Sequence, residues 1–244
     1  MDAARLAELL VERQPAVALT GAGISTESGI PDFRSADGIW SRYDPMAYAT
    51  IDAFRRDPRK VWEFYGLRLR VLADAEPNAA HRALATLEER GLLRAVVTQN
   101  IDTLHERAGS RDVVEVHGSI RQAVCLVDGT RVPRAEVVRL VDELGVPPCP
   151  ACGAILKPDV VMFGELLPGD AIDRATRLAR EAALLLVVGS TLEVWPVAGL
   201  PHETIAAGGV VAIVNRGPTA FDSYAALRLE GGAGETLEAV VDAL

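Results

Sequence analysis

Four short runs of apolar residues constrain the fold of this chain more than any other feature of its sequence. They lie at residues 16–20, 94–98, 183–188 and 210–214. Runs of this kind predict strands that are buried on both faces, which is typical of parallel sheets covered by helices. Predicted helices cover residues 2–13, 57–74, 78–90, 196–207 and 234–243. Because strands and helices alternate along the chain, the sequence predicts an α/β fold with a doubly wound parallel sheet.

Two segments interrupt this alternation. Residues 35–85 are predicted to be helical without an intervening strand. Residues 120–160 contain all three cysteines together with Pro147 and Pro148. We therefore expect both segments to be insertions that form a smaller module over the ligand-binding edge of the sheet. The sheet domain would then comprise residues 1–34, 86–119 and 161–244.

Composition and charge narrow the class of protein. Hydrophobic residues make up 49% of the chain, which is enough for a packed core. The net charge of −9 argues against partners that are nucleic acids or membrane surfaces, since both usually require a basic field. No run approaches the roughly 18 apolar residues of a membrane span, and residues 1–10 are acidic and amphipathic, unlike a signal peptide. Three cysteines fit a reducing compartment, so we expect a cytoplasmic protein.

Polar side chains follow two of the predicted strands. Gln99, Asn100 and Asp102 come directly after the second strand, and His117 follows a short apolar run at 112–116. Ligands of doubly wound sheets bind at the carboxyl ends of the strands, so we expect these groups to share one pocket. An imidazole in that pocket could act as a general base near neutral pH. His117 considered alone is equally compatible with a structural histidine.

A glycine-rich segment follows the first predicted strand. It includes Gly21, Gly23 and Gly29, and Phe33 and Arg34 come shortly after it. Glycines allow a backbone to approach a pyrophosphate closely, and amides at the start of a helix stabilise its charge. The alternative is a plain strand-to-helix turn, because the spacing differs from the Gly-x-Gly-x-x-Gly fingerprint of dehydrogenases.

These segments together closely resemble the sirtuins, the NAD-dependent protein deacylases. The resemblance implies a large Rossmann-like domain and a smaller module that is helical in one part and similar to a zinc ribbon in the other. NAD and an acyl-lysine would meet between the two. The matching segments, in the order of the family, are residues 21–25, 29–34, 98–102, 117–119, 163–165, 189–191 and 214–215.

The resemblance also implies roles for individual residues. His117 matches the catalytic base, assisted by Asn100 and Asp102, and the products would be free lysine, nicotinamide and an O-acyl-ADP-ribose. An extended substrate peptide would pair between residues 163–165 (Phe163, Gly164 and Glu165) and residues 191–194. The expected NAD-binding residues are Gly21, Ala22, Gly23, Ser25, Asp32, Phe33, Arg34, Gln99, Asn100, Asp102, Gly189, Ser190, Thr191 and Asn215.

One predicted helix bears on the choice of acyl group. Tyr65 and Arg68 are three residues apart, so they share a helix face, and a guanidinium beside a phenol suits a carboxylate. The pair resembles the signature of class III sirtuins, which implies desuccinylase and demalonylase activity with weaker deacetylation. Spacing alone would favour a surface arginine and a half-buried tyrosine, and a plain NAD-dependent deacetylase is the alternative.

The cysteine segment differs from the family pattern. Sirtuins usually hold structural zinc with two Cys-x-x-Cys pairs, but here Asp128 replaces the second cysteine of the first pair. Zinc accepts carboxylate oxygen, so Cys125, Asp128, Cys149 and Cys152 could bind it, though less tightly than four thiolates. The alternative is a module without metal that apolar packing stabilises. A redox pair of Cys149 and Cys152 is disfavoured, because no thioredoxin-like unit surrounds it.

Two other functions are compatible with the same NAD pocket. One is mono-ADP-ribosyl transfer to protein substrates. The other is an NAD-binding sensor without catalysis, which the presence of Asn100, Asp102 and His117 argues against. The sequence leaves the physiological targets and the oligomeric state open.

Overall fold

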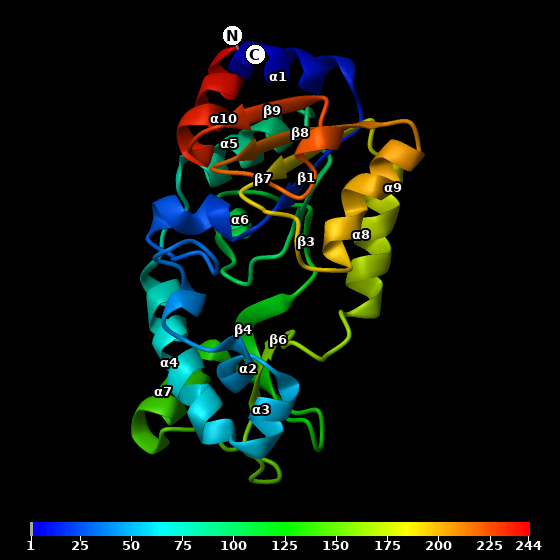
Figure 1. Ribbon diagram of the computed structural model, residues 1–244. Helices are drawn as coiled ribbons and strands as arrows, with labels where there is room; N and C mark the ends of the chain where they lie inside the picture. The colour runs from blue at the N-terminus through cyan, green and yellow to red at the C-terminus, as the bar shows by residue number, and fades with distance from the viewer. Residues whose placement is uncertain (1) are drawn as a thin grey trace.

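The computed structural model describes residues 2–244 (Figure 1). The strands of its larger part are β1 (Ala16–Thr20), β2 (Ala95–Thr98), β3 (Val113–Glu115), β7 (Leu184–Val188), β8 (Val210–Asn215) and β9 (Leu227–Glu230). They form a six-stranded sheet in the order β3-β2-β1-β7-β8-β9, and every neighbouring pair is parallel. The predicted α/β fold with a doubly wound parallel sheet is therefore confirmed. The order changes direction between β1 and β7, the point where such sheets bind ligands.

Helices cover both faces of this sheet and create two apolar layers. One layer contains α1 (Asp2–Glu12), α5 (Ala79–Glu89) and α10 (Ala233–Asp242), and the other contains α8 (Gly169–Glu181) and α9 (Leu200–Ala206). Side chains of β7 alternate between the layers, with Leu184 and Leu186 in the first and Leu185 and Val187 in the second. Figure 1 shows α8 and α9 running side by side along one flank of the sheet. Within residues 2–244, no helix combines the length and the apolar character that a membrane span requires.

A second, smaller part lies below the sheet in Figure 1. It consists of α2 (Pro45–Tyr48), α3 (Ile51–Arg56), α4 (Pro58–Asp74), α7 (Arg134–Leu144), β4 (Gly118–Val124), β5 (Arg131–Pro133) and β6 (Lys157–Val160). The three strands form an antiparallel sheet in the order β5-β4-β6. This part has a core of its own around Trp62, which is fully buried and donates its indole N–H to the Leu156 carbonyl at 2.7 Å. Asp57 caps α4 by accepting a hydrogen bond from the Lys60 amide, and Pro58 begins the helix.

The structure shows where helix α5 belongs. The domain boundary expected between residues 85 and 86 falls inside this helix, whose buried Ala80, Leu84 and Leu87 pack in the core of the large sheet. The helical segment that packs with the small sheet ends near Ala75, in the core around Trp62. The alternation of strands and helices along the sequence predicts that α5 is a helix. It does not predict whether α5 packs in the core of the large sheet or in that of the smaller part. The remaining short helices are α6 (Leu104–Arg107) and 3-10 turns at Ala22–Ser28, Ile39–Ser41, Val197–Gly199 and Asp222–Tyr224.

A buried ion pair ties the small sheet to the segment that follows it. The Lys157 ammonium is 4% exposed and lies 3.0 Å from a carboxylate oxygen of Glu165. It also donates to the carbonyls of Pro158 and Val160, at 3.0 and 2.7 Å. The same Glu165 oxygen accepts the Met162 amide at 2.8 Å. The Lys157 ammonium thus has three protein acceptors, and its pair with Glu165 holds residues 161–165 in a compact turn.

We expect Lys157→Met to destabilise the protein strongly, because it leaves the Glu165 carboxylate without its cation. Breaking a buried pair costs about 3–5 kcal/mol, and the value here should fall near the lower limit, since Glu165 retains some contact with solvent. Urea denaturation measures this loss. Arg139→Met on α7, which removes exposed pairs with Glu136 and Glu143, should leave the midpoint unchanged. Equal midpoints for Lys157→Met and the parent protein would contradict this role.

Candidate active site

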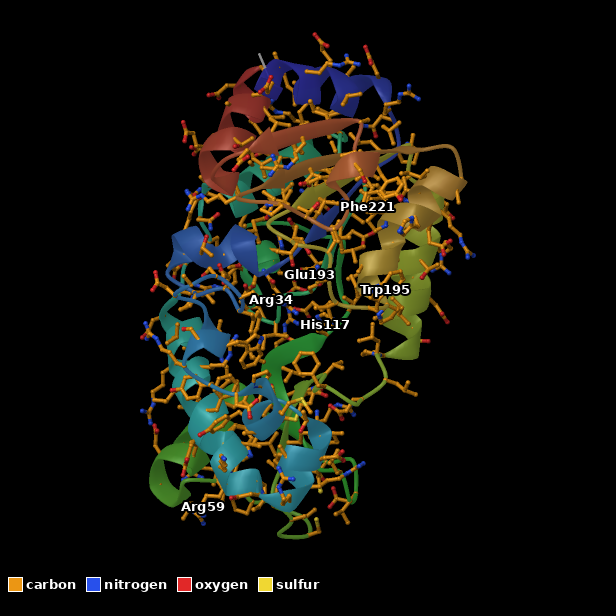
Figure 2. The ribbon with its side chains drawn as sticks, in the orientation of Figure 1. Arg34, Arg59, His117, Glu193, Trp195 and Phe221 are labelled. Atoms are coloured by element: carbon orange, nitrogen blue, oxygen red, sulfur yellow. The ribbon has the colours of Figure 1, made fainter. Side chains whose placement is uncertain are left out.

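The carboxyl ends of β1, β2, β7 and β8 open into a cavity of about 1290 Å³. The cavity lies between the large sheet and the smaller part, so both contribute to its walls. Figure 2 shows Arg34, Glu193, His117 and Trp195 gathered in the middle of the molecule, whereas Arg59 lies at the far end of the smaller part. The cavity is therefore placed where doubly wound sheets bind ligands.

The cavity brings together the residues that the sequence predicted for NAD, catalysis and substrate. The predicted metal ligands, Cys125, Asp128, Cys149 and Cys152, lie outside the cavity. The cavity walls include Gly21, Ala22, Gly23, Ser25, Asp32, Phe33, Arg34, Tyr65, Arg68, Gln99, Asn100, Asp102, His117, Phe163, Gly164, Glu165, Gly189, Ser190, Thr191 and Asn215.

Two glycine loops meet at the base of this cavity. The Gly23 amide donates to the Gly189 carbonyl at 2.8 Å, and the Gly21 amide donates to Val188 at 3.1 Å. Gly189 has a φ of +63°, and a Cβ atom there would lie 2.2 Å from the Ile24 nitrogen. A Cβ at Gly23 would lie 2.8 Å from the Gly189 Cα. The glycines are therefore needed for this backbone contact, and without side chains they leave the main chain open to close approach by a phosphate group.

A network of short polar contacts fixes the residues that follow β2. The Ser25 hydroxyl donates to the Asp102 carboxylate at 2.7 Å. The Asn100 side chain donates to the Gly21 carbonyl and to Ser25 Oγ, each at 3.1 Å. Thr103, next to Asp102, adopts a φ of +66°, a conformation that L-residues rarely take. The network locks the amide and the carboxylate of this loop against the first glycine loop.

Two buried histidines lie behind the network. His105 Nε2 is 2.9 Å from the Thr20 hydroxyl, which itself donates to Thr98 Oγ1, so this nitrogen carries the hydrogen. Burial lowers the pKa of His105 to about 3, so its imidazole is neutral at physiological pH. Burial also lowers the pKa of His81 to about 4. His81 Nε2 lies 3.4 Å from Ser25 Oγ, a contact that no sequence pattern predicted.

His117 is arranged to act as a base. Its Nδ1 lies 3.0 Å from the Gln99 carbonyl, which can only accept, so Nδ1 carries the hydrogen and Nε2 keeps its lone pair. Burial lowers the pKa of His117, and the hydrogen bond to Gln99 opposes that shift in part. The next residue, Gly118, has a φ of +73°, and a Cβ there would lie 2.4 Å from the Asp159 carbonyl. The imidazole is therefore neutral at physiological pH and held at the cavity wall.

The cavity wall that α4 contributes carries Tyr65 and Arg68. Burial raises the pKa of Tyr65 to about 12, and burial lowers the pKa of Arg68 below its usual range. Among residues 2–244, no carboxylate oxygen lies within 4.0 Å of the Arg68 guanidinium, unlike the neighbouring Arg70, which pairs with Asp142. Burial without a counter-ion is costly for a guanidinium, so this cation is available to an anionic ligand.

Two segments form the remaining edge of the cavity. Phe163 pairs with the chain before α3, since its amide donates to Ala49 and its carbonyl accepts from Ile51, at 2.9 and 3.0 Å. On the other side, Leu192 has a φ of +56°, and Glu193 lies 3.4 Å from Arg34 Nε. The sequence had indicated residues 163–165 and 191–194, but it did not single out Trp195. Trp195, at 69% exposure, extends this edge next to Pro196, and only its position directly after residues 191–194 could have suggested it.

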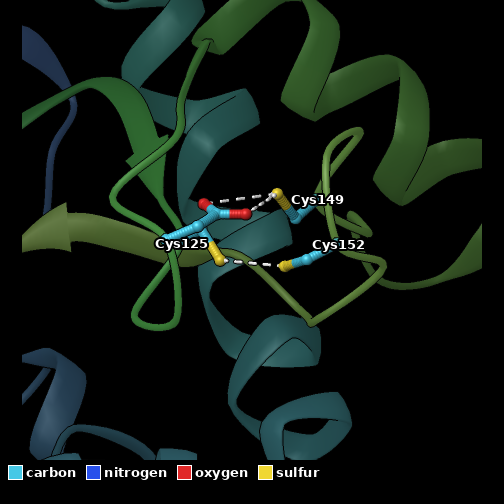
Figure 3. Close-up of side chains that lie close together, drawn as sticks. Cys125, Cys149 and Cys152 are labelled. Atoms are coloured by element: carbon cyan, nitrogen blue, oxygen red, sulfur yellow. Dashed lines mark hydrogen bonds between the residues drawn. The ribbon is translucent and has the colours of Figure 1, made fainter.

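The predicted metal residues gather in the smaller part of the molecule, where two turns face each other (Figure 3). The candidate ligand atoms of Cys125, Asp128, Cys149 and Cys152 all lie within 4.8 Å of one another. Cys125 Sγ is 3.5 Å from Cys152 Sγ, and Cys149 Sγ is 3.5 Å from an Asp128 oxygen. Tetrahedral zinc holds sulfur atoms roughly 3.8 Å apart at its usual bond length, so this donor set fits the ion.

Comparison with known proteins agrees with this geometry. Residues 21–196 match the model of the Sir2 family. An NAD-dependent protein deacylase of Pyrococcus abyssi is 46% identical over 238 residues, covering 97% of this chain and 95% of its own length. An NAD-dependent protein deacetylase of Caldivirga maquilingensis is 47% identical over 239 residues, covering 98% and 92%.

Solved structures give the same result. A Sir2 variant with a deacetylated p53 peptide and 3'-O-acetyl ADP-ribose superposes with a TM-score of 0.96 at 40% identity, covering 99% of this chain and 98% of its own. A Sir2 complex with a p53 peptide and NAD+ superposes with a TM-score of 0.92 at 40% identity and the same coverage. The chain therefore belongs to the Sir2 family, the sirtuins.

Proposed function

We propose that this protein removes acyl groups from lysine side chains of other proteins, with NAD as co-substrate, and that it prefers succinyl and malonyl groups to acetyl. The relatives named above support the general activity, since they are NAD-dependent deacylases and deacetylases. The acyl preference depends on one observation, the unpaired guanidinium of Arg68 in the cavity wall. Peptide substrates would bind in extended form between residues 163–165 and 191–194, where main-chain pairing tolerates many side chains.

The glycine cradle and the loop after β2 would hold NAD. The backbone of Gly21, Gly23 and Gly189 would lie close to a phosphate of NAD. Asn100 and Asp102 would make polar contacts on the nicotinamide side. The further NAD-binding residues would be Ala22, Ser25, Asp32, Phe33, Arg34, Gln99, Ser190, Thr191 and Asn215. Bound NAD supplies a ribose carbon that the acyl oxygen can attack as nicotinamide leaves.

His117 would take up a proton in this reaction. His117 lines the cavity, and its Nδ1 is fixed by the Gln99 carbonyl, so Nε2 is the atom that would accept a proton from a ribose hydroxyl. The activated hydroxyl would attack the acyl carbon, and one water molecule would then be consumed as the bond from that carbon to the lysine nitrogen breaks, which leaves the acyl group on the ADP-ribose. Free lysine, nicotinamide and an O-acyl-ADP-ribose would be the products.

An acyl group that ends in a carboxylate would accept hydrogen bonds from the two α4 side chains in the cavity wall, Tyr65 and Arg68. The Arg68 guanidinium lacks a counter-ion, and the Tyr65 hydroxyl stays protonated because burial raises its pKa to about 12. Both groups are therefore hydrogen-bond donors at neutral pH. An acetyl group would leave the guanidinium unsatisfied, whereas a succinyl or malonyl carboxylate would satisfy it.

We expect Arg68→Met to reverse the acyl preference. Hydrogen bonds to charged groups contribute about 1.5–3 kcal/mol, so kcat/KM for a succinyl-lysine peptide should fall about 10- to 100-fold. Steady-state kinetics on matched acetyl, succinyl and malonyl peptides measure this. Arg70→Met, two residues along the same helix, should leave the preference intact because Arg70 pairs with Asp142 outside the cavity. Acetyl turnover equal to or better than succinyl turnover, and insensitive to Arg68→Met, would disprove the preference.

The pH dependence should report on His117. A base whose pKa lies below 6.5 is already deprotonated at neutral pH, so kcat/KM should rise with pH, reach half its maximum below pH 6.5 and stay level above it. His117→Ala should lower kcat/KM by about 10²- to 10⁴-fold. His202→Ala serves as the control, since His202 packs on Phe221, away from the His117 wall (Figure 2). A normal rate in His117→Ala would exclude the ring as the base.

We also propose a structural zinc ion on Cys125, Asp128, Cys149 and Cys152. Support comes from the two turns, which bring all four donors within 4.8 Å of one another and which Gly129 and Gly153, each at φ +76°, close. The ion would stabilise the smaller part and take no part in the reaction. Since thiolates must stay reduced to hold it, we place the protein in the cytoplasm.

Metal analysis of protein purified without added zinc should find about one equivalent. The carboxylate oxygen is a harder ligand than a thiolate, so Asp128→Cys should retain zinc at chelator concentrations that strip the parent protein, and Asp128→Ala should lose it sooner. Asp52→Ala, an exposed aspartate on α3, is the matched control. A content far below one equivalent in both the parent and Asp128→Cys would show that apolar packing alone stabilises the module.

A further inference from the structure

The Arg68 guanidinium lies between two aromatic rings. Its Cζ atom is 5.1 Å from the centre of the Phe33 ring and 5.6 Å from the centre of the Phe64 ring. Both distances are within the range of about 6 Å over which a cation is attracted to a ring face. Phe64 is one helical turn before Arg68 on α4, whereas Phe33 belongs to the segment that follows the glycine loop of β1.

Other contacts hold these rings in place. Trp40 contacts both rings: its ring centre lies 5.2 Å from that of Phe33 in a tilted arrangement and 6.0 Å from that of Phe64 in a stacked one. The Trp40 amide donates to the Phe33 carbonyl at 3.0 Å, which closes the segment into a compact turn. The Asp32 carboxylate accepts the Arg34 amide at 3.0 Å within the same turn. The Phe33 ring is therefore held by contacts within its own turn as well as by Trp40.

Aromatic rings affect a buried cation differently from a carboxylate. A carboxylate partner would neutralise the guanidinium and leave little attraction for a second anion. Ring faces attract the cation and restrict its orientation, but they leave its full positive charge and its N–H donors available. The arrangement at Arg68 thus holds a partly buried cation in place at the cavity wall without neutralising it.

We propose, building on the acyl preference proposed above, that Phe33 positions the Arg68 guanidinium for the carboxylate of the acyl group. Phe33 also lines the NAD side of the cavity. One side chain would therefore serve both cofactor binding and acyl selection. Phe33 is a positioning residue in this role, because it acts on the acyl carboxylate through Arg68.

The ratio of kcat/KM for succinyl-lysine to that for acetyl-lysine peptides tests this role. Because Phe33→Leu also alters the NAD side, it should lower both rates, and the ratio removes that shared effect. We expect the ratio to fall about 3- to 30-fold in Phe33→Leu, in line with the strength of cation–ring contacts, and to recover in Phe33→Tyr. Phe54→Leu, the same change in the core of the smaller part, should leave the ratio unchanged.

The double variant separates the two proposals. In an Arg68→Met background, Phe33→Leu should change the ratio no further, because the cation that the ring positions is gone. Calorimetric binding of the succinyl peptide without NAD should weaken in Phe33→Leu, while binding of the acetyl peptide should not. If Arg68→Met abolishes the preference but Phe33→Leu leaves both ratio and affinity intact, the acyl preference stands and the role of Phe33 is disproved. A parent protein that does not prefer succinyl-lysine overturns both.

Discussion

The backbone contact between the loops after β1 and β7 is the constraint on which the site depends. Gly23 and Gly189 approach so closely that neither position has space for a side chain. This contact lies where the strand order of the sheet changes direction, so it determines the base of the cavity. Ser25, in the loop after β1, donates a hydrogen bond to Asp102 and accepts one from the Asn100 side chain. These two bonds position the residues that follow β2. The close backbone contact of Gly23 with Gly189 therefore determines the positions of polar groups that follow β1, β2 and β7.

The large sheet and the smaller part contribute different residues to the cavity. The large sheet carries the glycine cradle and the loop that holds Asn100, whereas α4 of the smaller part carries Arg68. His117 stands at the junction, immediately before β4 leaves for the small sheet. In this arrangement the cavity wall on α4 can vary without disturbing the groups that the large sheet holds. Phe33 joins the two, since it follows the glycine loop of the large sheet but contacts the Arg68 guanidinium on α4.

The central strands could be predicted from the sequence because their apolar runs are buried on both faces. Strand β9 was not predicted, since Leu227–Glu230 alternates apolar and charged residues at the edge of the sheet. Helix α8 was also missed, because few of its residues are buried. The residues that line the cavity could be named from the sequence because each lies at a strand end or in a segment that resembles sirtuins. The contact of Phe33 with Arg68 joins residues far apart in sequence, so no local spacing could reveal it.

The three tryptophans occupy very different surroundings. Trp62 is sealed in the core of the smaller part, Trp195 is largely open at the cavity edge, and Trp40 stacks on the two rings around Arg68. The indole fluorescence of this chain thus comes from a buried core, from the mouth of the cavity and from the aromatic rings beside Arg68. Its emission spectrum is a built-in optical signal, through which cavity occupancy can be followed without attaching a dye.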